Sequence, residues 1–133
     1  MEEKYINKLL FACSKAIKKG NIPISALIVK NNKIISIAYN KKETSKISID
    51  HAEILAIQKA SKKLKSWRLP DCEMYITLEP CSMCSGAIIN SRIKKIYIGL
   101  TGVEKNLNYV IYDWRSPIAS LFYESKVGEV EYE

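Results

Sequence analysis

Two short strings in the sequence carry side chains that are typical of metal chemistry. One is His51-Ala52-Glu53, and the other is Pro80-Cys81-Ser82-Met83-Cys84. Cys81 and Cys84 lie three positions apart, so in a helix they share a face and can bind one metal ion together. Both fall in the first turn after the proline, where the helix dipole and the unpaired N–H groups favour thiolate over thiol. The spacing therefore predicts a metal site at the start of a helix.

His51 is the single histidine of the chain and offers a third donor for this site. Three protein ligands leave the fourth tetrahedral position of zinc open, which is the arrangement of catalytic rather than structural zinc. Water in that position has a pKa of about 7. In the middle of a helix Glu53 would face away from His51, but near an irregular helix start both can point inward. We therefore expect Zn²⁺ on His51, Cys81 and Cys84, with Glu53 transferring protons without binding the metal.

The same residues also allow simpler interpretations. A lone Cys-x-x-Cys is commonly half of a structural zinc site or a redox pair. A redox pair needs neither a preceding proline nor a His-x-Glu at the start of a neighbouring helix. A structural site needs a fourth cysteine or histidine, and neither Cys13 nor Cys72 has a paired spacing. We expect Cys13 and Cys72 to be core thiols, and the two strings together favour catalytic zinc.

Length and composition limit the classes of protein that this sequence can encode. Its 133 residues fit a single domain, 1–133. The apolar content of 47% and the charged content of 26% are ordinary for a globular protein and exclude disordered and collagen-like classes. No apolar stretch reaches the roughly 20 residues of a membrane helix, and the first residues lack the pattern of a signal peptide. The sequence thus predicts one cytoplasmic domain with no membrane partner.

Positive charge is concentrated in the first hundred residues. The net charge is +7, with 18 Lys and Arg against 8 Asp and Glu in residues 1–100, and 3 against 6 in residues 101–133. Such an excess of positive charge is typical of proteins that bind a polyanion such as RNA. Lysines that lie on solvated faces and bind no partner would give the same composition. Clusters such as Lys18-Lys19 and Lys62-Lys63 are therefore assigned no contacts at this point.

Local signals mark where helices and strands begin and end. Gly20 is expected to end the first helix, Asp50 to be the N-cap of the second, and Pro80 to open the third. Asn31-Asn32 tolerates positive φ and predicts a hairpin between two β-rich runs. The expected elements are a helix over 4–19, strands over 24–29 and 34–39, a loop over 41–49, a helix over 50–64, a strand over 74–78, a helix over 80–90 and a strand over 95–100.

The order of these elements predicts an α/β fold. The helix between the third and fourth strands forces a parallel crossover, whereas the hairpin is antiparallel, so the sheet is mixed. We expect a three-layer α/β/α sandwich with a mixed sheet of four to five strands and helices on both faces. Residues 109–112 could supply the fifth strand and protect an edge of the sheet.

The two motifs, together with their surroundings, resemble a known family. The combination of His-x-Glu with Pro-Cys-x-x-Cys is the signature of zinc-dependent nucleobase deaminases. Residues 68–93 match the bacterial tRNA-specific adenosine deaminases (TadA) almost without gaps, and so do residues 22–29, although Ser25 stands where that family usually has glycine. Residues 1–100 as a whole resemble TadA closely, within the cytidine deaminase-like superfamily.

The resemblance implies a cytidine deaminase-like fold and the hydrolysis of adenosine to inosine at the wobble position of a tRNA anticodon loop, by a homodimer. It assigns zinc binding to His51, Cys81 and Cys84, proton transfer to Glu53, contact with the flipped base to Asn40, and the lining of the base pocket to Ile22 and Leu78. Judged from the residues alone, Asn40 could instead shape a turn, and Ile22 and Leu78 could be ordinary core.

The likeness to TadA ends near Gly99. That family continues with an aspartate and a C-terminal helix, but Gly102 stands at the aspartate position here and no helical pattern follows. Residues 111–123 instead resemble a segment of UvrD/HelD-like DNA helicases, a likeness that begins around residue 95 and brings no nucleotide-binding loop. We expect an atypical C-terminal tail, 101–133, whose negative charge weakens RNA binding while the zinc site still forms.

Three functional hypotheses follow. The first is wobble adenosine deamination in tRNA. The second is deamination of a free base, cytosine or guanine, because pocket shape and flanking-nucleotide contacts decide the substrate and the motifs do not. The third is a truncated deaminase fold that binds zinc without turnover.

Overall fold

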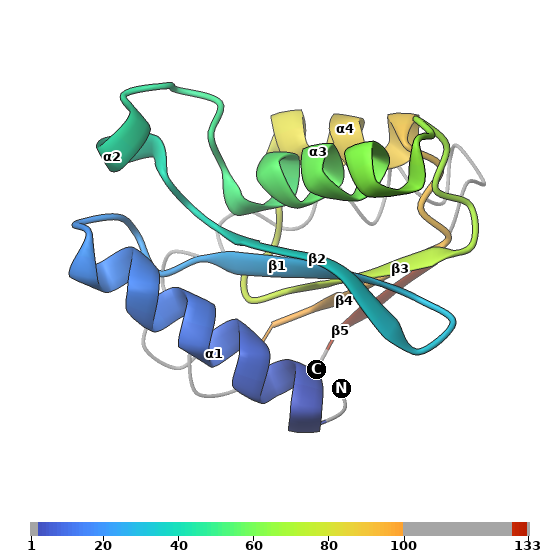
Figure 1. Cartoon of the computed structure of the whole chain (residues 1–133), viewed down its shortest axis with the longest axis horizontal. Helices are drawn as coiled ribbons and strands as arrows, with labels where there is room; N and C mark the ends of the chain where they lie inside the picture. The colour runs from blue at the N-terminus through green and yellow to red at the C-terminus, as the bar shows by residue number, and fades with distance from the viewer. Residues whose placement is uncertain (1–2, 100–128, 133) are drawn as a thin grey trace.

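The fold is a five-stranded sheet between two layers of helices. The computed structural model of the chain describes residues 3–99 and 129–132. Two helices, α3 and α4, cover one face of the sheet, and α1 covers the other (Figure 1). The elements are α1 (Glu3–Lys18), β1 (Ser25–Lys30), β2 (Lys33–Tyr39), α2 (Lys42–Ser45), α3 (Ala52–Leu64), β3 (Cys72–Ile76), α4 (Ser82–Asn90), β4 (Lys95–Ile98) and β5 (Glu129–Tyr132).

The sheet is mixed, as the order of elements predicted. Its strand order is β2-β1-β3-β4-β5. Strand β1 pairs antiparallel with both β2 and β3, whereas β4 pairs parallel with β3 and with β5. The parallel pair of β3 and β4 is joined by the crossover helix α4, which confirms the three-layer architecture. The observed fifth strand comes from residues 129–132, and the strand predicted over 109–112 lies outside the described residues.

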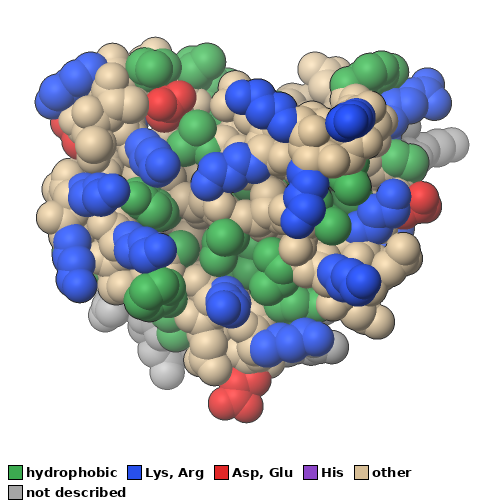
Figure 2. Space-filling model, in the orientation of Figure 1, with side chains coloured by type: hydrophobic (Ala, Val, Ile, Leu, Met, Phe, Trp, Pro, Cys, Tyr) green, Lys and Arg blue, Asp and Glu red, His purple; other side chains and the backbone are tan. Residues whose placement is uncertain are grey.

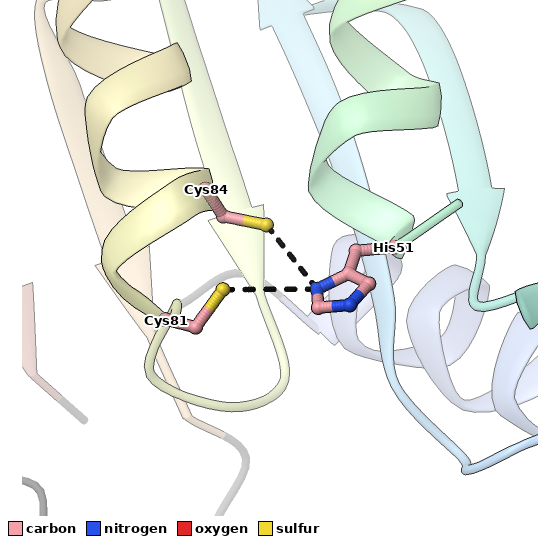
Figure 3. Close-up of side chains that lie close together, drawn as sticks. All are labelled: His51, Cys81 and Cys84. Atoms are coloured by element: carbon pink, nitrogen blue, oxygen red, sulfur yellow. Dashed lines mark hydrogen bonds between the residues drawn. The ribbon is translucent and has the colours of Figure 1, made fainter. Parts of the chain in front are cut away.

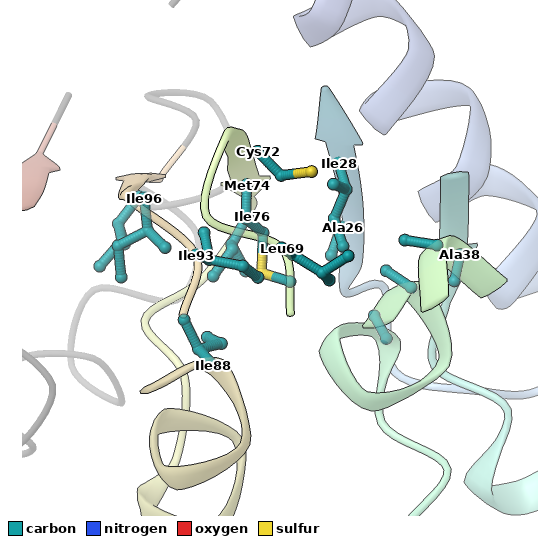
Figure 4. Packing of buried hydrophobic residues seen from close by; sticks show 14 residues of the cluster. Ala26, Ile28, Ala38, Leu69, Cys72, Met74, Ile76, Ile88, Ile93 and Ile96 are labelled. Carbon is teal, nitrogen blue, oxygen red and sulfur yellow. The ribbon is translucent and has the colours of Figure 1, made fainter. Parts of the chain in front are cut away.

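Side chains of β1 alternate between the two faces of the sheet. Ala26 and Ile28 pack on the side of α3 and α4, whereas Leu27 and Val29 pack against α1. Figure 4 shows the larger of the two clusters, in which small and large side chains from the sheet interlock with both helices. On α3 the buried core contacts are the alanines Ala52, Ala56 and Ala60. Their small size brings the start of α3 close to the sheet.

No helix in the described part of the chain is both long and apolar enough to cross a membrane.

Two turns form as the sequence predicted. Asn31 and Asn32 have φ of 51° and 62°, which is the left-handed conformation that a two-residue hairpin requires. Gly20 has φ of 80° at the end of α1. Its N–H donates to the carbonyl oxygen of Ile17 at 3.0 Å, and the next N–H donates to that of Ala16 at 2.9 Å. This pair of bonds is a Schellman motif, which satisfies carbonyl groups left free at the helix end.

The prediction of a plain loop over 41–49 was wrong, because this segment contains the short helix α2. Its sequence carries no apolar periodicity, so no local pattern could reveal it. The helix is held from a distance by Asn21, whose Oδ1 accepts hydrogen bonds from the N–H groups of Glu43 at 2.9 Å and Thr44 at 3.2 Å. Asn21 thus satisfies N–H groups that every helix start leaves free.

Gly20 and Gly86 give a matched pair of stability predictions. An added Cβ meets no atom within 4 Å at either position, so the backbone decides the effect. At Gly20 the positive φ makes alanine unfavourable by about 1–2 kcal/mol, whereas Gly86 lies inside α4, where alanine stabilises by roughly 0.5–1 kcal/mol. We expect urea denaturation to show a lower free energy of unfolding for Gly20→Ala and a higher one for Gly86→Ala. Effects of the same sign would contradict the helix end described above.

Candidate active site

His51 and Cys81 occupy equivalent positions at the starts of two neighbouring helices. His51 is the N-cap of α3, with φ of −77° and ψ of 153°, and Cys81 is the N-cap of α4, with φ of −71° and ψ of 175°. Each backbone carbonyl accepts the first helical hydrogen bond, while neither side chain is used as a cap. The side chains are therefore free to turn toward each other (Figure 3). The N-cap predicted at Asp50 was one residue too early.

The ring nitrogen Nδ1 of His51 faces both cysteine sulfurs. It lies 3.5 Å from Sγ of Cys84 and 3.7 Å from Sγ of Cys81, and the ligand atoms of these residues all lie within 4.8 Å of one another. In a tetrahedral zinc site, Zn–N of about 2.0 Å and Zn–S of about 2.3 Å place nitrogen and sulfur about 3.5 Å apart. One nitrogen and two sulfurs at this spacing fit a zinc ion with its fourth position open.

Burial controls the protonation of these donors. Partial burial, and then the positive charge of Lys42, lower the pKa of His51, which keeps the imidazole neutral and able to bind a metal. Burial raises the pKa of Cys84, and the nearby Glu53 carboxyl group adds to the effect. The helix start alone therefore does not make Cys84 a thiolate in the metal-free protein, contrary to the expectation from sequence. A bound cation reverses this preference, so metal binding and thiol deprotonation are coupled.

Glu53 lies in the first turn of α3 with its side chain buried, only 4% exposed. Burial raises the pKa of its carboxyl group, and hydrogen bonds with its own backbone and with Cys84 partly offset the rise. Its carboxyl group faces the site, within hydrogen-bonding reach of Cys84. Within the described residues the metal-ligand group comprises His51, Cys81 and Cys84, and Glu53 stands beside it. This position suits a group that transfers protons next to a metal.

The three predicted base-contacting residues are placed differently from one another. Asn40 is buried, and its Oδ1 accepts a hydrogen bond from the N–H of Lys42 at 2.9 Å, so it does shape a turn. Its side-chain NH₂ has no partner among residues 3–99. Ile22 is 55% exposed, which excludes ordinary core. Leu78 is half-buried in the segment between β3 and Cys81. Contact of these residues with a base stays a prediction.

A buried hydrogen-bond network, which the sequence did not predict, lies next to the segment between β3 and Cys81. The N–H of Ser25 donates to Oγ1 of Thr77 at 3.1 Å, and the N–H of Thr77 donates back to the carbonyl oxygen of Ser25 at 3.1 Å. The hydroxyl of Ser25 donates to the carbonyl oxygen of Leu9 at 2.8 Å and lies 3.2 Å from Sγ of Cys13. This network fixes the start of the segment that carries Cys81. The signal in the sequence was Ser25 itself, at a position where the TadA family usually has glycine.

The fold and this site together define a class of protein. A three-layer α/β/α sandwich with His-x-Glu and Cys-x-x-Cys at two adjacent helix starts is the arrangement of the cytidine deaminase-like enzymes. More narrowly, the chain belongs to the MafB19-like deaminase family, whose model matches residues 1–131. The matched range includes most of the C-terminal tail, 101–133. The helicase likeness of residues 111–123 and the effect of the tail on RNA binding concern residues outside the described ones and stay predictions.

Individual relatives confirm the resemblance to TadA. The tRNA-specific adenosine deaminase of Bacillus subtilis (strain 168) is 45% identical over 98 residues, which cover 74% of this chain and 61% of that protein. The chain thus spans less than two thirds of that relative. A structure solved in work on A-to-I editing by tRNA:A34 deaminases has a TM-score of 0.77 at 26% identity, covering 100% of both chains. Guanine deaminase from Bacillus subtilis has a TM-score of 0.70 at 30% identity, covering 89% of this chain and 83% of that one.

Proposed function

We propose that this protein is a zinc-dependent deaminase that hydrolyses adenosine to inosine at the wobble position of a tRNA. The main support is the convergence of Nδ1 of His51 with the sulfurs of Cys81 and Cys84 beside the buried carboxyl group of Glu53. Three ligands with an open fourth position suit catalytic zinc. The adenosine and tRNA specificity is supported by the relatives that carry this name at 40–45% identity.

The residues of the chain have separate roles in this proposal. His51 uses Nδ1, and Cys81 and Cys84 use their sulfurs, to hold zinc, which when bound supplies the Lewis acidity that activates water near neutral pH. Glu53 takes one proton of the attacking water on a carboxylate oxygen and delivers it to ring nitrogen N1 of the adenine. It then takes the second proton, from the hydroxyl formed at C6, and delivers it to the amine, which leaves as the C–N bond breaks. One water is consumed and one ammonia is released, so adenosine becomes inosine. The burial of Glu53 keeps this proton from exchanging with bulk solvent.

Asn40, Ile22 and Leu78 would hold the base that is flipped into the site. Within residues 3–99 the side-chain NH₂ group of Asn40 has no hydrogen-bond partner, so it is available as a donor to the base. The exposed side chain of Ile22 and the half-buried one of Leu78 offer apolar surface to its faces. A polar contact at the edge and apolar contacts on the faces are how deaminases read an extruded base.

We also propose that the protein acts in the cytoplasm as a homodimer on the tRNA anticodon loop. The resemblance to TadA implies both the compartment and the dimer. Two aliphatic side chains close to the metal ligands support a partner surface there. Ile49, two residues before His51, is 49% exposed, and Met83, between the two cysteines, is 38% exposed.

A substrate comparison tests the proposed function. The zinc-loaded chain is incubated with an anticodon stem-loop carrying adenosine at the wobble position, with the same RNA carrying adenosine elsewhere in the loop, and with free guanine and cytosine. We expect mass spectrometry to find inosine in the first RNA alone. Xanthine from guanine without inosine would favour a guanine deaminase, the alternative that the 30% identical B. subtilis fold supports. If the zinc-loaded protein formed no product from any of these substrates, the hypothesis of a truncated deaminase fold that binds zinc without turnover would be favoured.

A further inference from the structure

Lysines from separate parts of the chain meet at the outer edge of the sheet. Strand β2 is an edge strand, and Tyr39 is its last residue. The Nζ atoms of Lys19 and Lys41 lie 5.7 and 5.1 Å from the centre of the Tyr39 ring. Lys59, on α3, donates a hydrogen bond from Nζ to the carbonyl oxygen of Ile37 at 2.9 Å. Three lysines, far apart in sequence, thus converge on a short stretch of one strand.

Lys15 lies one helical turn before Lys19, whose N–H donates to the carbonyl oxygen of Lys15 at 3.3 Å, and the Nζ of Lys15 lies 4.8 Å from the centre of the Phe11 ring. The positive charges of Lys19, Lys41 and Lys15 lower the pKa of the Tyr39 hydroxyl, the hydrogen bond with Lys19 having the largest effect. Burial, and then Lys41 and Lys15, lower the pKa of Lys59. No carboxylate in residues 3–99 forms an ion pair with these four lysines. Like charges held this close without a counter-charge favour the binding of an anion.

This group of lysines is continuous with the metal site. The N–H of Lys41 donates to the carbonyl oxygen of Asp50 at 3.0 Å, which holds it next to His51. Asn40 lies between Tyr39 and Lys41 in the chain, and its Oδ1 accepts a hydrogen bond from the N–H of Lys42 at 2.9 Å. Figure 2 shows the face with β2 in front, where lysine and arginine side chains are many and acidic ones few. Positive charge therefore extends from the metal ligands along the sheet edge.

We propose that Lys15, Lys19 and Lys41 form a phosphate-binding surface, the β2-edge lysine surface, for the RNA strand that leads away from the target nucleotide. Basic groups around an aromatic ring are typical of surfaces that bind single-stranded nucleic acid, with the ring stacking on a base. Tyr39 supplies that ring. The proposal rests on the proposed function, because the target nucleotide of the same strand has to reach the metal site.

A charge-matched pair of variants tests this surface. One variant is Lys15→Gln/Lys19→Gln/Lys41→Gln, and Lys59 is left in place because it holds a strand carbonyl. The control, Lys62→Gln/Lys63→Gln/Lys94→Gln, removes the same charge from exposed lysines elsewhere. Fluorescence anisotropy measures the affinity for the anticodon stem-loop over a salt series. For the first variant we expect affinity at low salt to fall by at least about tenfold and the slope of log K against log salt to shrink by about 2. The control should change by much less.

Equal losses in the two variants would overturn the proposal, since net charge alone would then explain binding. In a second part of the experiment, the binding of the same variants to vesicles containing phosphatidylserine is measured. Vesicle binding that depends on the three lysines, with unchanged RNA binding, would also overturn it in favour of a membrane surface. Fluorescence anisotropy measures binding and does not require turnover. A failure of the lysine surface can therefore be distinguished from a failure of the proposed function. Stem-loop binding that depends on the surface in a protein that forms no inosine would contradict the proposed function and leave the surface supported.

Discussion

Glu53→Gln is expected to lower the rate of deamination by at least about 10²–10⁴-fold while zinc and fold are retained. Glutamine keeps the size and reach of the side chain but cannot accept the proton of the attacking water. Its neutral amide also suits the buried position, where burial already disfavours the charged carboxylate. The measurement is a single-turnover assay for inosine, made together with metal analysis and circular dichroism.

An exposed glutamate provides the control. Glu43 lies on the surface of α2, so Glu43→Gln should leave both turnover and zinc content unchanged. Loss of zinc in Glu53→Gln would show that Glu53 is a ligand, and the proposed proton transfer would have to be abandoned. Normal turnover in Glu53→Gln with zinc present would equally contradict the role given to this carboxyl group.

Cys81→Ser and Cys84→Ser are expected to lose the metal. A serine hydroxyl is a poor zinc ligand, and removing a direct ligand should lower zinc affinity by more than the roughly 10–100-fold that loss of a supporting residue costs. Because metal binding contributes to folding stability, added zinc should raise the melting temperature of the wild-type chain but not of these variants. Zinc content per chain and thermal denaturation with and without chelator measure the two effects.

The other two cysteines separate metal loss from general damage. Cys13 and Cys72 are buried away from the ligand group. Cys13→Ala and Cys72→Ala should each keep about one zinc per chain and a zinc-dependent rise in melting temperature, even where the lost packing lowers stability. If Cys81→Ser and Cys84→Ser retained their metal as fully as these controls, the metal centre would be placed wrongly.

Features set by neighbours along the chain could be predicted from sequence. Asn31-Asn32 dictates a hairpin because its left-handed backbone fits a two-residue turn, and Gly20 ends a helix for the same conformational reason. The ligand residues could be proposed because the Cys-x-x-Cys spacing places two sulfurs on one helix face. Each of these inferences needs only a few consecutive residues.

Features set by distant residues could not be predicted in this way. Helix α2 depends on Asn21, 22 residues before Glu43. Which nitrogen of His51 faces the cysteines depends on how α3 and α4 pack, and so does the inward direction of Glu53. The thiol of Cys84 was expected to be acidic from its helix position alone, but burial, which only the tertiary structure reveals, outweighs that effect.

The lysines illustrate the same limit. The sequence draws attention to adjacent pairs, such as Lys18-Lys19 and Lys62-Lys63. The β2-edge lysine surface instead combines Lys15, Lys19 and Lys41, whose proximity around Tyr39 arises only when α1 packs beside β2. Charge counted along the chain therefore indicated that a polyanion was a plausible partner, and the fold indicates where on the surface it would bind.

X-ray absorption at the zinc K edge tests the central claim most directly, because it reports the atoms bound to the metal. Three protein ligands with an open fourth position predict two sulfurs at about 2.3 Å and two lighter atoms, nitrogen or oxygen, at about 2.0–2.1 Å. Cys81→Ser should lose this spectrum, and Glu53→Gln should preserve it. Four sulfur neighbours, or a protein that binds no zinc, would contradict the assignment of a catalytic metal centre to His51, Cys81 and Cys84.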